Sequence, residues 1–218
     1  LNINNDEIET EDNLITKAYF LMKSLCNEKS EFSFKVQKNI PIGAGLGGGS
    51  SNCASTLIVL NRLFKLNLPE NKLLKIGLSL GSDVPFFIKG KNSIARGRGE
   101  LLKTIPREAN YYLIIYPGIN ISTAYAFRFY DENKTDFPAD LKNDFEYFAR
   151  KVYPEINEIF ILMSQYGTVE LSGTGSSMYL NFKSSEEAYT IATKVPTNCK
   201  FFVTKSLDKS PIYDELNK

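Results

Sequence analysis

The sequence predicts an α+β protein divided into two domains. A glycine-rich loop near residue 45 separates a strand pattern from a helix pattern, and a new hydrophobic pattern begins in a buried strand at Tyr111. Elsewhere helices and strands alternate irregularly, without the strict alternation of a doubly wound sheet. We place the domain boundary in the linker 105–110, which divides the chain into residues 1–106 and 107–218.

In the first domain the elements follow from apolar spacing and from capping residues. Helical spacing behind the acidic cap Asp12 predicts a helix to about Cys26, and alternation over residues 32–36 predicts a half-buried strand that continues to Lys38. The later elements are a helix opened by Ser50 and Ser51, a helix from Pro69 to about Leu80, a break at 81–85, a short apolar strand at 86–88 and a hairpin or edge strand at 90–100.

In the second domain a short buried strand at 111–116 is closed by Pro117 and Gly118. Ser122 and Thr123 cap a short helix through Phe127. The remaining predicted segments are a polar loop at 131–140, helices at 141–151 and 154–165, a second glycine cluster at 171–177, a strand at 178–182, a helix at 186–194 and a last strand at 201–204.

The composition excludes several classes of protein. The 218 residues are 43% hydrophobic, which allows a sizeable core, and 26 basic against 25 acidic residues leave no broad basic face for nucleic acid. No apolar run reaches the roughly 20 residues of a membrane span, so we expect a cytoplasmic protein without a membrane partner. Three separated cysteines and no histidine argue against a disulfide framework, a zinc site and Ser-His-Asp chemistry.

The glycine-rich loop has the composition of a phosphate site. Five glycines occur within the seven positions from Gly43 to Gly49, and they leave a run of backbone N–H groups almost without side chains above them. Because the predicted helix follows directly, its unpaired N–H groups and the positive end of its dipole point into the loop.

Four other interpretations of the loop are weaker. A structural turn needs one or two glycines rather than five. A dinucleotide fingerprint has a literal match at 43–48 but needs an acid about 20 residues on, and the candidate Glu70 lies at a predicted helix start. A Walker loop needs Gly-Lys-Ser/Thr and a protein kinase needs His-Arg-Asp, and the sequence contains neither.

Six short motifs carry a family resemblance. They are Gly-Leu-Gly-Gly-Gly-Ser-Ser-Asn at 45–52, Ser-Asp-Val-Pro-Phe-Phe at 82–87, Ile-Ser-Thr-Ala-Tyr at 121–125, Asn-Asp-Phe-Glu at 143–146, Tyr-Pro-Glu-Ile at 153–156 and Ser-Gly-Thr-Gly-Ser-Ser at 172–177. In this order they resemble the GHMP kinase superfamily, whose ATP loop Pro-x-x-x-Gly-Leu-x-x-Ser-Ser is similar to 41–51 apart from one extra glycine. Within the superfamily they look most like the kinases of a cytidyl-linked methylerythritol.

The resemblance implies a two-domain GHMP kinase fold, with an N-terminal ribosomal-protein-S5-like ATP domain and a C-terminal ferredoxin-like domain. It implies transfer of the γ-phosphate of ATP, with Mg²⁺, to the 2-hydroxyl of this small molecule in the non-mevalonate route to isoprenoid precursors. The residues implied to bind ATP are Asn13, Lys38, Pro41, Gly43, Gly45, Leu46, Gly47, Gly48, Gly49, Ser50 and Ser51. A hydroxyl of Ser50 or Ser51 is expected near the metal.

Asp83 is the candidate catalytic residue. It lies in the break between a helix and the apolar strand, where a carboxylate can accept the proton of a substrate hydroxyl or orient it. By its residues alone it is more readily a cap of the turn 81–85, and the resemblance reverses this preference. Asp144 and Glu146 are alternative carboxylates on a predicted helix.

The resemblance also implies the residues that contact the substrate. Phe127 matches a position that stacks on cytosine, although a core phenylalanine fits the same aromatic run, and Thr123 is expected to touch the same ligand. Gly173 and Gly175 match a motif beside the active cleft, and as turn glycines they would be required in any case.

Two other functions compete with this one. A kinase of mevalonate or homoserine belongs to the same superfamily, and a nucleotide-binding module without catalysis belongs to a different class. Members of the resembled group carry a lysine and a Gly-Tyr-His segment before the region that corresponds to Leu1. We therefore expect the 218-residue polypeptide alone to be poorly stable and nearly inactive.

Overall fold

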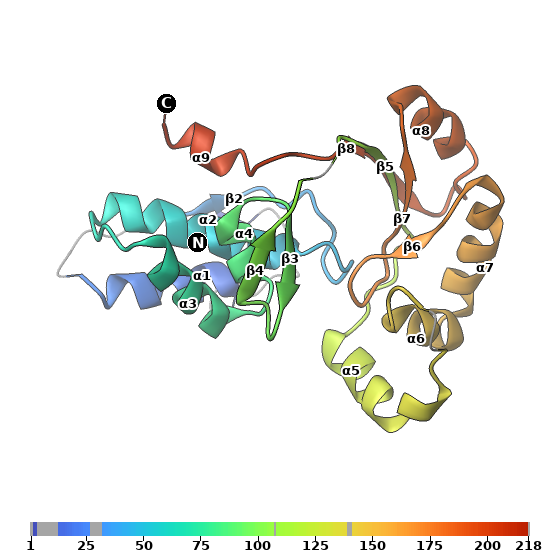
Figure 1. Cartoon of the computed structure of the whole chain (residues 1–218), viewed down its shortest axis with the longest axis horizontal. Helices are drawn as coiled ribbons and strands as arrows, with labels where there is room; N and C mark the ends of the chain where they lie inside the picture. Colours follow the sequence, from blue (N-terminus) through green and yellow to red (C-terminus); the bar gives the residue numbers. More distant parts are fainter. Residues whose placement is uncertain (1, 4–12, 27–31, 107, 139–140, 218) are drawn as a thin grey trace. The chain divides into compact units, whose positions relative to one another are not determined.

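The fold was analysed in a computed structural model that describes residues 2–3, 13–26, 32–106, 108–138 and 141–217. The chain forms two compact units (Figure 1). The first unit contains the described residues within 1–39, 47–107 and 208–218, and the second contains 40–46 and those within 108–207. The sequence predicts a single boundary at 106/107. In the structure the segment 40–46 instead belongs to the second unit, and the described residues within 208–218 belong to the first.

The first unit is mainly helical. Its helices are α1 (Leu14–Lys23), α2 (Gly48–Leu63), α3 (Glu70–Leu80), α4 (Val84–Lys89) and α9 (Ile212–Glu215). Its strands are β1 (Asn2–Ile3), which runs parallel to β2 (Lys35–Val36), and the antiparallel hairpin of β3 (Ser93–Arg96) and β4 (Leu101–Thr104).

The core of the first unit lies between α1, α2 and α4. Apolar residues three and four positions apart on α2, such as Cys53, Leu57 and Leu60, are fully buried. Met22 of α1 and Ile88 of α4 pack in the same cluster. The helical spacing of the sequence therefore places one continuous face of α2 in this core.

The second unit is an antiparallel sheet with helices. Its strands lie in the order β6 (Glu170–Leu171), β7 (Met178–Phe182), β5 (Tyr111–Tyr116) and β8 (Lys200–Lys205), with β5 between β7 and β8 (Figure 1). Its helical segments are α5 (Thr123–Glu132), η1 (Lys134–Asp136), α6 (Phe145–Val152), α7 (Pro154–Met163), η2 (Ser164–Tyr166) and α8 (Ser185–Ala192).

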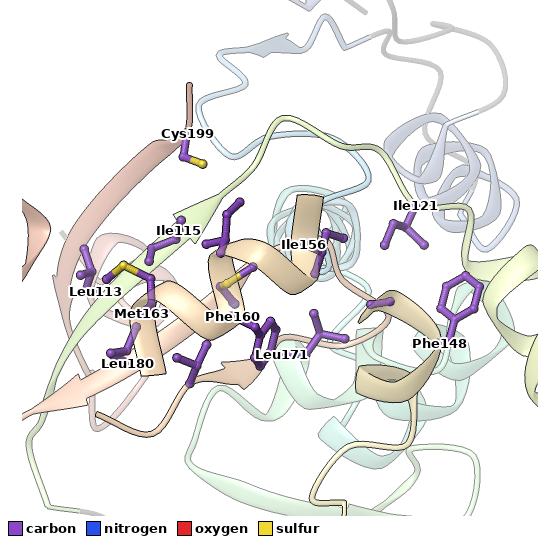
Figure 2. Close-up of a cluster of buried hydrophobic side chains, with 14 of the residues drawn as sticks. Leu113, Ile115, Ile121, Phe148, Ile156, Phe160, Met163, Leu171, Leu180 and Cys199 are labelled. Atoms are coloured by element: carbon purple, nitrogen blue, oxygen red, sulfur yellow. The ribbon is translucent and has the colours of Figure 1, made fainter. Parts of the chain in front are cut away.

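Alternation along β5 creates the core of the second unit. Leu113 and Ile115, two positions apart, are fully buried and share one face of the sheet. Figure 2 shows them facing Phe160 and Met163 of α7, with Leu180 of β7 beside them. The short buried strand expected at 111–116 is therefore one of the two inner strands of this sheet.

The structure corrects several predicted elements. The apolar run 86–88 lies in helix α4 rather than in a strand, and α2 begins at Gly48 rather than at the two serines. Helix α5 continues to Glu132, and α6 begins only at Phe145. The predicted cap Asp12 lies outside the described residues. The strand at 178–182 is confirmed, whereas β6 and α9 were not expected.

Candidate active site

The start of α2 presents backbone donors that no described side chain caps. Gly47 is the N-cap in the left-handed conformation (φ 65°), and within the described chain no side chain makes a capping hydrogen bond there. The first intrahelical bond joins the Ser51 N–H to the Gly47 carbonyl at 2.9 Å, so the N–H groups of Gly48, Gly49 and Ser50 precede the helical ladder. The first turn contains no acidic residue, and this end of the helix therefore suits an anion.

A glycine is required at position 47 by its neighbour as well as by its backbone. A Cβ there would lie 2.9 Å from Cζ of Phe87 on α4. Ser50 and Ser51, expected to open the helix, instead lie in its first turn. Both are half-buried, and the N–H of Ser50 is itself one of the three donors.

Asp83 occupies the N-cap position of α4 without acting as a cap. Its side chain is exposed and makes no capping hydrogen bond to the described helix. It precedes Phe87 by four positions, hence by about one turn, and the ring of Phe87 abuts Gly47. Asp83 and the start of α2 thus belong to the same region of the first unit.

The hairpin tip between β3 and β4 lies against the residue before Asp83, a contact that the sequence did not predict. Gly99 has φ 111°, and a Cβ on it would collide with the Ser82 carbonyl oxygen. The tip is held by a 2.7 Å hydrogen bond from the Arg98 N–H to Glu100 Oε2. Only glycine permits this approach of the hairpin to the turn that carries Asp83.

Asn13 and Lys38 have different surroundings. Asn13 is the N-cap of α1, where its Oδ1 accepts from the N–H groups of Ile15 and Thr16 at 2.9 and 3.1 Å. Lys38 is half-buried, and burial lowers the pKa of its amine. Asn13 therefore has a structural role in addition to the predicted one, and contact of either residue with ATP stays a prediction.

In the second unit, residues 43–45 of the glycine loop accept hydrogen bonds at their backbone carbonyls from other segments of that unit. Gly45 O accepts from Ser172 Oγ at 2.8 Å, and Ala44 O accepts from the Ser177 N–H at 3.1 Å. The Ile121 N–H donates to Gly43 O at 3.4 Å. The two glycine clusters of the sequence, at 43–49 and 172–177, thus meet in residues 43–45.

Gly45 shows how close this approach is. Its φ is +72°, and a Cβ on it would collide with the Ser172 carbonyl oxygen and lie 2.7 Å from that of Gly175. Gly173 and Gly175, expected beside a cleft, pack here against the first loop. Their positive φ values of 56° and 89° also give them the turn role that the sequence allowed.

Asn143 is a residue whose role the sequence analysis missed. Its Nδ2 donates to the carbonyls of Leu171 at 3.0 Å and Gly173 at 2.8 Å, and its Oδ1 accepts from the Phe145 N–H at 3.0 Å. The only signal in the sequence was its place at the head of the motif 143–146.

The two alternative carboxylates follow Asn143. Glu146 forms an ion pair with Arg150 at 2.8 Å, one turn along α6, and its side chain is only 15% exposed. Asp144 is the N-cap residue of α6 by position, and it makes no capping bond to the described helix. Both line a cavity of about 590 Å³ beside α6 and β6.

Phe127 and Thr123 lie on α5. Phe127 is 53% exposed and meets Phe145 edge-on at 4.8 Å between ring centroids, which excludes the core phenylalanine that the sequence left open. Thr123 Oγ1 lies 3.3 Å from Thr174 Oγ1, within hydrogen-bond distance. The start of α5 therefore adjoins the second glycine loop.

The described residues contain no group of three or more His, Cys, Asp or Glu side chains that could hold a metal ion. The helices of the described part of the chain include none long and apolar enough to cross a membrane.

Comparison with known proteins identifies relatives over nearly the whole chain. The GHMP kinases N terminal domain matches residues 13–91, and the GHMP kinases C terminal domain matches residues 137–200. A 4-diphosphocytidyl-2-C-methyl-D-erythritol kinase of Acinetobacter baylyi is 38% identical over 217 residues, which cover 95% of this chain and 77% of that protein. One of the same name from Buchnera aphidicola is 38% identical over 228 residues, or 98% of this chain and 78% of the relative.

Solved structures agree with these sequence matches. A crystal structure of 4-(cytidine 5'-diphospho)-2C-methyl-D-erythritol kinase has a TM-score of 0.78 at 26% identity and covers 94% of this chain and 81% of its own. A homoserine kinase from Cytophaga hutchinsonii has a TM-score of 0.66 at 16% identity, covering 95% of this chain and 80% of its own. The second likeness is one of fold alone.

Proposed function

The chain belongs to the GHMP kinase family, and we propose that it is the member that phosphorylates the 2-hydroxyl of 4-diphosphocytidyl-2-C-methyl-D-erythritol with ATP. The fold is that of the two-domain GHMP kinases, as the family matches at both ends of the chain require. The substrate is supported by the names of relatives 38% identical over most of the chain. The observation that carries the chemistry is the start of α2, whose amides no described side chain caps and whose Gly47 is contacted by Phe87, one turn after Asp83.

In the proposed reaction the first turn of α2 binds the phosphates of ATP. The amides of Gly48, Gly49 and Ser50 donate to phosphate oxygens, and glycines nearby allow the close approach of the nucleotide. Asn13, Lys38, Pro41 and the loop residues 43–47 are proposed as further contacts. Phosphoryl transfer depends mainly on alignment and on neutralisation of charge, and this is what such a loop supplies.

Asp83 is proposed to accept the proton of the substrate hydroxyl. The alcohol oxygen forms a bond to the γ-phosphorus as the bond from that phosphorus to the bridging oxygen breaks, and ADP leaves. The proton of the hydroxyl passes to the carboxylate. Two observations support this role: the Asp83 side chain is exposed, and it makes no capping bond to the described helix. The carboxylate is therefore available to a substrate hydroxyl.

Mg²⁺ is part of the proposal. Bound Mg²⁺ would neutralise phosphate charge, and it commonly takes few protein ligands beside the phosphates. The first turn of α2 fits this chemistry, because the hydroxyls of Ser50 and Ser51 lie there and are only half-buried. We also propose a cytoplasmic location, supported by three cysteines that are all free thiols.

The substrate end is proposed to lie on α5 in the second unit. The exposed ring of Phe127 is available to stack on cytosine, a contact worth about 1 to 3 kcal/mol per base. Thr123, Gly173 and Gly175 are proposed to contact the same ligand. Their support is the contact between Thr123 and the second glycine loop.

A panel of substrates tests the proposal. ADP production should be measured with the cytidyl-linked substrate, mevalonate and homoserine under identical conditions, in the full-length protein. We expect turnover with the first compound only. Turnover with mevalonate or homoserine would instead assign the protein to another branch of the family, and ATP binding without turnover of any would favour a nucleotide-binding module.

Substitution Phe127→Ala tests the substrate end. We expect a rise of about tenfold in KM for the cytidyl substrate with little change in KM for ATP, because stacking on one base is lost. Tyr125→Ala on the same helix is the control, since this ring packs edge-on against the buried Phe148 at 5.4 Å. The control should lower thermal stability. An unchanged KM in Phe127→Ala would refute the stacking role.

A further inference from the structure

We propose that Asn143 is a positioning residue for the phosphate-binding loop, which it holds through the second glycine loop. The inference rests on the proposed function only in naming phosphate as the ligand of the loop. Asn143 bonds to none of the residues proposed to bind ATP, although its partner Gly173 is among the proposed contacts of the substrate. Its effect passes through two short sets of hydrogen bonds within the second unit.

The first set of bonds fixes the second glycine loop. The amide of Asn143 donates to two carbonyls two residues apart, at Leu171 and Gly173, and so fastens the entrance of this loop from both sides of Ser172. The loop is closed by further bonds from the Ser172 N–H to Ser177 O and from the Gly175 N–H to Ser172 O, each 2.9 Å long.

The second set of bonds joins this loop to the first glycine loop. Ser172 Oγ donates to Gly45 O, and the Ser177 N–H donates to Ala44 O. Since a Cβ at Gly45 would collide with Ser172 O, the two loops are in direct backbone contact as well. A displacement of Ser172 must therefore displace residues 44–45, which lead directly into the amides at the start of α2.

Asparagine suits this position because its side chain carries both a donor group and an acceptor. The site uses two N–H donors from the amide nitrogen and one acceptor from the amide oxygen, which accepts from the Phe145 N–H. Aspartate retains the acceptor but has no donors, and serine retains a short acceptor that does not span to both carbonyls. The bond that Asn143 accepts from the Phe145 N–H and the fastening of the loop are therefore separable by substitution.

Two variants isolate the fastening of the loop. Asn143→Asp and Asn143→Ser keep an acceptor for the Phe145 N–H and lose the amide donors. Ser184→Ala is the matched control, because it removes a cap from α8 in the same unit, where Ser184 Oγ accepts from the Glu187 N–H at 3.2 Å. The control should lower stability without contact to either glycine loop.

The measurements are the dissociation constant of a non-hydrolysable ATP analogue with Mg²⁺, KM for both substrates, and thermal stability, in the full-length protein. In both Asn143 variants we expect the nucleotide to bind about tenfold more weakly, equivalent to about one hydrogen bond's net contribution. KM for the cytidyl substrate should rise less than this, because Gly173 is one of several proposed contacts of that substrate. Ser184→Ala should leave nucleotide affinity unchanged.

Two results would overturn the inference. One is unchanged nucleotide affinity in both Asn143 variants. The other is an equal weakening of binding for ATP and for the cytidyl substrate, if Ser184→Ala shows the same weakening when it lowers thermal stability by the same amount. Failure of the proposed function is a separate result, since it appears as no turnover of the cytidyl substrate by the unmodified protein. The nucleotide-binding measurement does not depend on that turnover.

Discussion

Asp83 combines the position of a helix cap with a side chain that is not used as one. It lies at the N-cap of α4, is exposed, and makes no capping bond to the helix as described. An aspartate at such a position ordinarily hydrogen-bonds backbone N–H groups of the first turn. Its conformation here supports the catalytic role proposed for it over the capping role that its local sequence favours.

Asp83→Asn should separate catalysis from binding. We expect turnover to fall by about two to four orders of magnitude, because the amide does not accept the hydroxyl proton. The affinity for ATP should stay nearly unchanged, and stability should change little because no capping bond is lost. Steady-state kinetics and nucleotide titration measure the two effects. Equal turnover by the variant and the parent would exclude Asp83 as the catalytic base.

Gly45 and Gly118 form a natural pair for testing the loop contact. Both belong to the second unit and have positive φ, at 72° and 80°, but a Cβ at Gly118 meets no described atom within 4 Å. Gly118→Ala should cost about 1 to 2 kcal/mol of unfolding free energy, the cost of a left-handed alanine. Gly45→Ala should cost clearly more and also weaken ATP binding, because the backbone of the second loop must move. Equal losses in the two variants would contradict the close contact.

At the scale of elements, α2 contributes its first turn to the candidate site and a later face to the hydrophobic core. Its first turn carries the uncapped amides, while the face that follows buries Cys53, Leu57 and Leu60. The packed face holds the helix in place, and so holds the amides in a fixed direction. Anchoring of this kind reduces the reorganisation needed when an anion binds.

Burial of Cys53 predicts a pH dependence of stability. Burial raises the pKa of the Cys53 thiol to about 11, above its value in an unfolded chain. The folded protein therefore holds this proton over a range in which the unfolded chain releases it. The corresponding stability is fully present below the unfolded pKa, about 8.5, and is lost as the pH rises through about 11.

Chemical denaturation at pH 8 and pH 10.5 checks this expectation. The parent protein should lose more unfolding free energy between the two pH values than Cys53→Ala does, because titration of the other groups cancels in the comparison. Alkylation of Cys53 at pH 8 should require unfolding, since the side chain is 0% exposed in the native state. Identical losses in the two proteins would show that the thiol does not contribute.

At the scale of the whole molecule, the chain enters and leaves each unit more than once. Residues 40–46 belong to the second unit although they precede α2 of the first, and the last residues return to the first unit. Tyr213 donates its hydroxyl proton to the Ile88 carbonyl, and the Ser210 N–H donates to Gly90 O at 2.8 Å. The C-terminal segment thus stabilises the end of α4.

Removal of residues 208–218 should destabilise the first unit selectively. We expect the local free energy of opening to fall by about 2 to 3 kcal/mol at α4 and β3, from lost hydrogen bonds and exposed Tyr213 surface. Hydrogen exchange followed by mass spectrometry should show unchanged protection in β5 and β7.

Tyr213→Phe should give a smaller loss of about 1 kcal/mol in the same local free energy of opening, since only one hydrogen bond is removed. Uniform deprotection of both units would contradict the division.

The sequence alone determined the elements whose apolar period is clear, such as α2 and β7, because side-chain burial on one face follows directly from that period. It also predicted β5, a short apolar run that Pro117 and Gly118 close. It misassigned α4, since a short and fully apolar run shows neither period clearly. It also identified the glycine loop and the family, because both depend on residues near one another in the chain.

Only the tertiary structure decided which distant segments meet. The bond from Ser172 to Gly45 joins residues 127 positions apart, and Asn143 reaches carbonyls 28 and 30 positions away. It likewise decided that Asp83 makes no capping bond to the described helix, that Phe127 is outside the core and that Tyr213 packs on α4. No local pattern encodes such pairings, because they depend on the free energy of packing the whole chain rather than on the preference of any one segment.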